Sequence, residues 1–164
     1  MRLLSDVLHA WTVCVPIAGQ NSPSEPHYGK RRPFCFCRPY MKGPAHVLLV
    51  EDDRDTREMY SEFLTHSGLD VTEAPTGYRA LEEARERRPD VVVTDIAMPG
   101  MDGLELSRTL RRNDSTCNVP IIAVSGNASE RAREAGCNVV LEKPCAPDTL
   151  LHVIEDVLKE PGSE

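Results

Sequence analysis

From Ala45 onward, short apolar runs alternate with longer amphipathic stretches, and this alternation restricts the possible folds more than any other feature. Four of the runs are too short to form helices and are rich in β-branched residues, which favours strands. These runs are Val47–Val50, Val91–Val93, Ile121–Val124 and Val139–Leu141. We expect all four to be buried on both faces of a sheet. A weaker alternating run, Leu69–Glu73, is typical of an exposed edge strand.

The stretches between these runs have apolar residues at helical spacing. In the first stretch, Met59, Phe63 and Leu64 mark the predicted inner face, and Gly68 ends the helix. The other four helices are marked by Ala80, Leu81 and Ala84; Leu106 and Leu110; Ala128, Ala132 and Ala135; and Leu150, Leu151, Ile154, Val157 and Leu158. Five strand–helix pairs predict an α/β fold with a doubly wound, five-stranded parallel sheet.

Residues 1–44 have a different composition. They contain many prolines and a cationic cluster, Lys30–Arg32, but no periodic apolar face, which is typical of a disordered segment. Met41 lies a few residues ahead of the first strand, and we interpret it as the natural start of the protein. A basic tail that contacts a partner is the alternative. We therefore predict a disordered extension over residues 1–44, a folded domain over residues 45–160 and a tail over residues 161–164.

The folded part is acidic. After residue 44 it has 13 Lys and Arg residues and 24 Asp and Glu residues, a formal charge of −11, which argues against direct binding to nucleic acid. No apolar run approaches the roughly 18 residues that span a bilayer, so we expect no membrane insertion. The spacing of the six cysteines predicts neither a zinc site nor a disulfide framework, which favours a cytoplasmic protein.

Polar side chains follow four of the predicted strands, at the edge of a parallel sheet where ligands usually bind. They are Glu51, Asp52 and Asp53 after the first strand, Asp95 after the third, Ser125 after the fourth and Lys143 after the fifth. Each has a structural alternative: Asp53 can cap a helix, Ser125 can satisfy a turn, and Lys143 can be solvated. Their joint occurrence favours a functional site.

Transfer of a phosphoryl group to a carboxylate is the chemistry that requires this set. Glu51, Asp52 and Asp95 repel one another unless a hard cation lies between them, and Mg²⁺ accepts a few carboxylates while it keeps several waters. Lys143 and the Ser125 hydroxyl would supply further positive charge and hydrogen bonding to the phosphoryl oxygens. Asp95 is then the predicted nucleophile.

Four motifs carry a specific resemblance to a known family. They are Leu49–Asp53 (LVEDD), Thr94–Gly103 (TDIAMPGMDG), Val124–Gly126 (VSG) and Glu142–Pro144 (EKP). In this order they resemble the receiver domain of bacterial two-component response regulators, the CheY-like family, over residues 45–160. The resemblance implies the flavodoxin-like strand order 2-1-3-4-5 of CheY.

The resemblance also implies a role for each site residue. Glu51 and Asp52 are the acidic pair that holds Mg²⁺ together with Asp95 and the backbone carbonyl of Ala97. Asp95 accepts the phosphoryl group, Ser125 is the switch hydroxyl and Lys143 contacts the phosphate. The bond before Pro144 is expected to be cis. Such a protein is not an enzyme acting on external substrates. A sensor histidine kinase or a phosphotransfer protein would be its phosphodonor, and an effector protein would receive the signal.

One position departs from the family pattern. Receivers usually have an aromatic residue three positions before the lysine, which turns inward when the switch hydroxyl moves, and here that position is Val140. A small β-branched side chain cannot make the same rotamer change. We expect the signal through the fourth helix, fifth strand and fifth helix to be muted or differently built.

Two other functions share part of this pattern. A phosphatase of the haloacid dehalogenase type also uses an aspartyl nucleophile but needs a second acid two residues later, where this chain has Ala97. A phosphorylation-independent adaptor would be favoured if Asp52, Asp95 or Lys143 were missing, and all three are present. The chain ends six residues after Leu158, so we expect a stand-alone receiver without an output domain.

Overall fold

The structure is a computed structural model, and it describes residues 43–126 and 130–159. The predicted extension over residues 1–44 therefore lies almost wholly outside the described residues, as does the predicted tail over residues 161–164. Ala128, expected on the fourth helix, also lies outside them.

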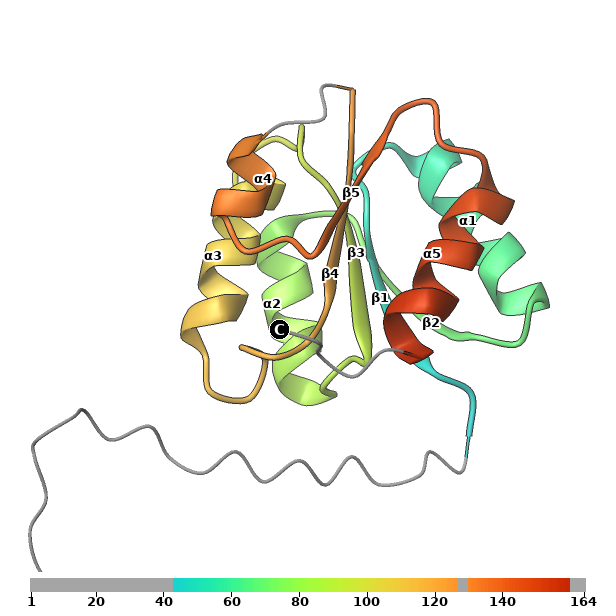
Figure 1. The fold of residues 1–164 in the computed structure, drawn as a ribbon, viewed down its shortest axis with the longest axis horizontal. Coiled ribbons are helices and arrows are strands. Elements are labelled where there is room, and N and C mark those ends of the chain that lie inside the picture. Colours follow the sequence, from blue (N-terminus) through green and yellow to red (C-terminus); the bar gives the residue numbers. More distant parts are fainter. Residues whose placement is uncertain (1–42, 127–129, 160–164) are drawn as a thin grey trace, which may run out of the picture. The chain divides into compact units, whose positions relative to one another are not determined.

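Five parallel strands form one sheet in the order β2-β1-β3-β4-β5 (Figure 1). The strands are β1 (His46–Val50), β2 (Asp70–Ala74), β3 (Val91–Asp95), β4 (Ile121–Ser125) and β5 (Val139–Glu142). The register pairs Val50 of β1 with Thr94 of β3, and Asp95 with Val124 of β4. These findings confirm the doubly wound parallel sheet and its strand order. The weak run that was predicted to be an edge strand is β2.

Five helices connect the strands and cover both faces of the sheet. They are α1 (Arg54–His66), α2 (Gly77–Glu86), α3 (Gly103–Arg112), α4 (Glu130–Glu134) and α5 (Pro147–Lys159). Helices α1 and α5 lie on one face, and α2, α3 and α4 lie on the other (Figure 1). Among the described helices, none is long and apolar enough to cross a membrane.

Side-chain caps fix where three of the helices begin. Asp53, Thr76 and Asp102 each accept a hydrogen bond from the backbone N–H three residues later, at 2.9, 3.2 and 2.7 Å. These bonds satisfy backbone donors that have no partner within the helix. Since each cap lies in the loop that follows a strand, these bonds also hold the loops at the carboxyl edge of the sheet.

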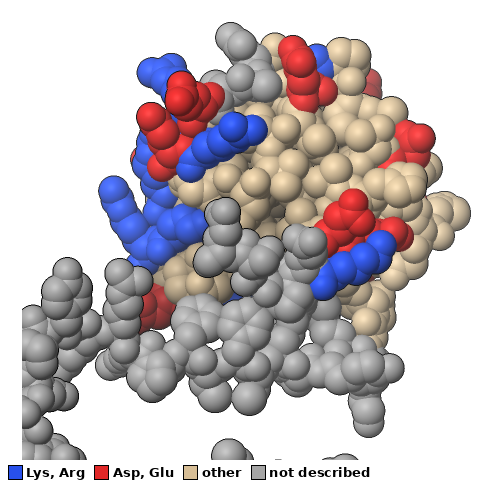
Figure 2. Space-filling view, in the orientation of Figure 1, with Lys and Arg blue, Asp and Glu red and all other residues tan. Residues whose placement is uncertain are grey.

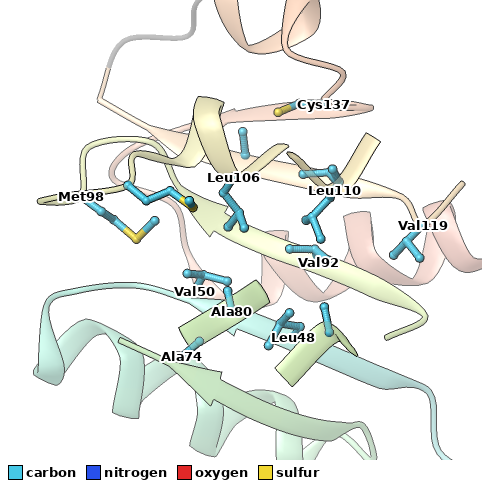
Figure 3. Close-up of a cluster of buried hydrophobic side chains, with 14 of the residues drawn as sticks. Leu48, Val50, Ala74, Ala80, Val92, Met98, Leu106, Leu110, Val119 and Cys137 are labelled. Carbon is cyan, nitrogen blue, oxygen red and sulfur yellow. The ribbon is translucent and has the colours of Figure 1, made fainter. Parts of the chain in front are cut away.

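The core consists of two apolar clusters, one on each face of the sheet. Alternate residues of β1 point to opposite faces, so Leu48 and Val50 join one cluster while Val47 and Leu49 join the other. Figure 3 shows the first cluster, in which Leu48 and Val50 lie with Val92, Leu106 and Leu110. The second cluster packs β1, β3 and β4 against Tyr60 and Leu64 of α1 and against Leu150 and Ile154 of α5.

Two predictions about burial were wrong. Val139–Leu141 was expected to be buried on both faces, but β5 is an edge strand and its residues are only half-buried. Met59 and Phe63 were expected on the inner face of α1, yet they are 44% and 37% exposed. Leu64, also expected there, is buried as predicted, and Tyr60 takes the other inner position. The Tyr60 ring is buried because its hydroxyl reaches the backbone oxygen of Cys145 at 2.7 Å, which satisfies its polar group.

Candidate functional site

The predicted site residues meet at the carboxyl edge of the sheet. Glu51 follows β1, Asp95 ends β3, and Ser125 ends β4, the next strand along. Lys143 follows β5, and its backbone N–H donates to the Ser125 carbonyl at 2.8 Å. The strand order thus brings together residues that are up to 92 positions apart in the chain.

Three carboxylates form the centre of the site. Each of Glu51, Asp52 and Asp95 offers an oxygen that lies within 4.8 Å of the others. Glu51 and Asp95 are buried, whereas Asp52 is exposed at the mouth of the site. Because like charges this close repel one another, the cluster requires nearby positive charge.

Lys143 supplies positive charge to the two buried carboxylates. Its Nζ donates to Asp95 Oδ2 at 2.8 Å and to Glu51 Oε2 at 3.0 Å. The second Asp95 oxygen, Oδ1, accepts the backbone N–H of Ala97 at 3.1 Å. Both Asp95 oxygens are therefore held in fixed positions. The peptide bond between Lys143 and Pro144 is cis, as the family resemblance implied.

The pKa values of Glu51 and Lys143 reflect this crowding. Burial, reinforced by the charge of Asp95, raises the pKa of Glu51 above its ordinary value near 4.5, although the hydrogen bond from Lys143 opposes the rise. Burial alone would lower the pKa of Lys143, but its hydrogen bonds to Asp95 and Glu51 outweigh this and raise the pKa above 10.5. The surroundings thus favour the charged form of Lys143 and disfavour the charged form of Glu51.

Replacing Glu51 with glutamine should therefore stabilise the metal-free protein. A carboxyl group whose pKa is raised by folding costs stability at pH 7, and this cost disappears as the pH falls through its folded pKa toward 4.5. We expect Glu51→Gln to raise the free energy of unfolding by about 1 kcal/mol at pH 7, within the usual range for a stabilising single substitution, because the amide has no charge to bury and Lys143 keeps its contact with Asp95. Near pH 4.5 the two proteins should be equally stable.

Urea denaturation at both pH values measures this effect, and Glu58→Gln is the control because Glu58 forms an exposed pair with Arg54. A Glu51→Gln protein less stable than the parent at pH 7 would contradict the assignment of unfavourable charge to Glu51.

The three carboxylates suit Mg²⁺. They provide hard oxygen ligands on one open side of the site, where Asp52 faces solvent, so a bound ion could keep several waters. The Ala97 carbonyl, expected to complete the metal site, belongs to the residue whose N–H holds Asp95. Its contribution to the metal remains a prediction.

The structure also places the residues with expected signalling roles. Ser125 is buried at the end of β4, one position beyond the partner of Asp95 in the strand register. Val140 pairs with Ala123 and packs partly buried against the cluster that contains Leu48 and Val50. Valine has no aromatic ring that could turn inward at this position.

Sequence reasoning missed two residues that support the site. Arg57, on the first turn of α1, donates to the carbonyls of Glu51 and Asp52. Gly103 begins α3, and a Cβ built there would lie 2.2 Å from the Asp95 backbone oxygen. The glycine at the end of the TDIAMPGMDG motif was visible in the sequence, but the close approach that requires it was not.

Comparison with known proteins agrees with this geometry. Residues 47–155 match the family described as the response regulator receiver domain. The chain belongs to this family. A similar relative is the polar-differentiation response regulator DivK of Brucella anthropi, with 32% identity over 119 residues that cover 70% of this chain and 97% of DivK.

Solved receiver structures resemble this chain at about the same level of sequence identity. The chemotaxis response regulator CheY4 of Vibrio cholerae superposes with a TM-score of 0.67 and 32% identity, covering 70% of this receiver and 98% of CheY4. The receiver domain of a sensor histidine kinase from Pseudomonas aeruginosa gives a TM-score of 0.67 and 30% identity, covering 72% of this chain and all of that one. That structure has a magnesium ion coordinated in its active site cleft. The acidic cluster of this receiver resembles such a magnesium site.

Proposed function

We propose that this receiver accepts a phosphoryl group on Asp95 from a sensor histidine kinase or a phosphotransfer protein, in a Mg²⁺-dependent phosphorelay. The observation that carries the proposal is the position of Asp95. It ends β3 within a cluster of three carboxylates, and Lys143 contacts it directly. Among the described residues, this arrangement fits acceptance of a phosphoryl group better than turnover of an external substrate, because the second acid of a dehalogenase-type phosphatase is replaced by Ala97.

The proposed reaction forms an acyl phosphate. One carboxylate oxygen of Asp95 attacks the phosphorus of a phosphohistidine, the phosphorus–nitrogen bond breaks, and its electron pair remains on the imidazole ring, which takes up a proton. Mg²⁺ bound by Glu51, Asp52 and Asp95 would neutralise charge on the phosphoryl oxygens. The Lys143 ammonium group, held 2.8 Å from Asp95, would stabilise the same oxygens from the protein side.

Ser125 is the proposed reporter of the phosphorylated state. New phosphoryl oxygens beside Asp95 offer acceptors to its hydroxyl, and movement of Ser125 would shift the loop that leads to α4. With Val140 instead of an aromatic residue on β5, we propose that the response is concentrated at this loop and α4.

The signal is proposed to leave through a protein surface. DivK, almost all of which is matched by this receiver, supports a stand-alone role. Figure 2 shows a largely uncharged area in the middle of one face, where β5 lies between α4 and α5 in Figure 1. Such a surface suits an effector protein better than nucleic acid. The described cysteines are free thiols, which suits the proposed cytoplasmic location.

Labelling with a small phosphodonor tests the proposed function. Incubation with acetyl phosphate and Mg²⁺ should add one phosphoryl group to the protein, observed by intact mass, and Asp95→Asn should take up none. Omission of Mg²⁺ should also prevent labelling. If the parent protein were not labelled although it is folded, a phosphorylation-independent adaptor would replace this proposal. Equal labelling of Asp95→Asn would contradict the choice of acceptor.

A further inference from the structure

We infer that Arg57 and Glu73 form a clamp that positions the acidic loop, residues 51–53, for Mg²⁺, an inference that rests on the proposed function. Arg57 contacts the backbone oxygens of Glu51 and Asp52 rather than their carboxylates. It holds the backbone from which these carboxylates extend. The clamp makes Arg57 a positioning residue rather than a ligand or a catalytic residue.

The contacts of Arg57 are directed at the loop. Its Nη1 donates to the carbonyl oxygen of Glu51 at 2.7 Å and to that of Asp52 at 3.3 Å. Its Nε lies 3.3 Å from Glu73 Oε2. The side chain is only 13% exposed, whereas its neighbour Arg54 is 78% exposed and pairs with Glu58 on the helix surface. Burial and three partners fix the guanidinium in one place.

Glu73 connects this guanidinium to the sheet. It lies on the edge strand β2, where it is the register partner of Leu49. The next residue, Ala74, accepts the backbone N–H of Glu51 at 3.2 Å. The acidic loop is therefore tied to β2 twice, once by its own backbone and once through Arg57. Removal of the clamp would leave the Asp52 end of the loop with fewer constraints.

The positive charge of Arg57 and its positioning role predict opposite effects on Mg²⁺ binding. A guanidinium beside a cation site repels the cation, so its removal should tighten Mg²⁺ binding if charge were its main effect. Glu73 offsets part of this charge. If positioning dominates, removal should weaken Mg²⁺ binding instead, because groups that orient metal ligands contribute to affinity without touching the metal. The two effects have opposite signs, which makes the clamp testable.

The test is a Mg²⁺ titration of the full chain followed by amide NMR shifts. We expect Arg57→Gln to weaken Mg²⁺ binding about tenfold, the lower end of the range for groups that support metal ligands. Arg54→Gln removes the same charge from the same helix but breaks only the exposed pair with Glu58, so its Mg²⁺ affinity should be unchanged or slightly higher. Arg57→Lys keeps the charge but lacks the planar fork, and should lie between the parent and Arg57→Gln.

Glu73 supplies a second test that does not depend on the Arg57→Gln protein alone. Glu73→Gln should weaken Mg²⁺ binding in the parent, because Arg57 then loses its anchor. Charge removal also contributes to that loss, so the decisive measurement is the double variant. If Glu73 acts through Arg57, Glu73→Gln should cause at most a small further loss when Arg57 is already glutamine.

The outcomes separate this inference from the proposed function. Unchanged or tighter Mg²⁺ binding by Arg57→Gln, with binding by the parent intact, would overturn the clamp and leave the phosphoacceptor site in place. Additive losses in the double variant would likewise overturn it. If the folded parent bound no Mg²⁺ and took up no phosphoryl group, the proposed function itself would be contradicted, and the clamp with it. Melting of each metal-free variant detects loss of fold. If Arg57→Gln does not fold, Arg57→Lys, which keeps the positive charge, decides the question: weaker Mg²⁺ binding supports the clamp, and parental binding overturns it.

Discussion

Replacing Lys143 with methionine should slow phosphorylation of Asp95 by about a hundredfold or more. Lys143 is the described cation that directly contacts the acceptor, at 2.8 Å from Asp95 Oδ2. Removal of one preorganised donor from a site where charge develops typically costs a factor of about 10² to 10³ in rate. Time courses of labelling with acetyl phosphate and Mg²⁺, measured by intact mass, give this rate for the variant and the parent.

The same variant should be less stable without metal. Glu51 and Asp95 would remain buried without the ammonium group that pairs with both. Removal of one partner from a buried ion pair costs about 3–5 kcal/mol, and because Lys143 is 31% exposed we expect about 2 kcal/mol. Saturating Mg²⁺ should increase the free energy of unfolding of Lys143→Met more than that of the parent, since the ion replaces part of the missing positive charge.

Lys159→Met is the matched control, because Lys159 pairs with Glu155 on the exposed side of α5. This control should be labelled and should melt like the parent. A Lys143→Met protein that is labelled at the parental rate would show that Lys143 does not serve the transfer step.

Replacing Gly103 with valine should destabilise the domain by about 3 kcal/mol or more. A Cβ at this position would lie 2.2 Å from the Asp95 backbone oxygen and 2.9 Å from Ile96 Cα, and backbone atoms cannot move aside as a flexible side chain can. Overpacking of a dense interior typically costs about 1–3 kcal/mol, and this contact is at the severe end. Helix α3 would have to withdraw from the end of β3, where the acceptor lies.

Urea denaturation of Gly103→Val measures this loss, and Gly43→Val is the control because nothing lies within 4 Å of a Cβ built at Gly43. The control should keep the stability of the parent. Equal stability of Gly103→Val and the parent would show that α3 does not depend on this close approach.

The order of elements and the location of the site could be predicted from the sequence because both follow from local patterns. Apolar runs mark strands, and the residue after each strand falls at the carboxyl edge of the sheet. This reasoning predicts that Asp95 and Lys143 lie close together, and the distance between them is 2.8 Å. The strand order itself came from the family resemblance, since periodicity does not determine which strands are neighbours.

What could not be predicted depends on packing between distant segments. Leu64 was predicted on the inner face of α1 and is buried, but Met59 and Phe63 fit helical spacing as well as Tyr60 does. Only the packing of α1 against the sheet decides that Tyr60 is buried and that Met59 and Phe63 are not. The apolar run at β5 suited a central strand equally well, and its place at the edge left it half-buried. Arg57 gave no signal because an arginine on the first turn of a helix is usually solvated, and its carbonyl partners arise from the path of the acidic loop.

The most direct test of the central claim is to locate the phosphoryl group within the chain. The protein is labelled with acetyl phosphate and Mg²⁺, treated with borohydride, which reduces an acyl phosphate on aspartate to homoserine, and then digested for peptide mass spectrometry. We expect homoserine at position 95 alone, with Asp52 and every other aspartate unchanged. Homoserine at another aspartate, or none despite incorporation of phosphate, would contradict the assignment of Asp95 as the phosphoacceptor.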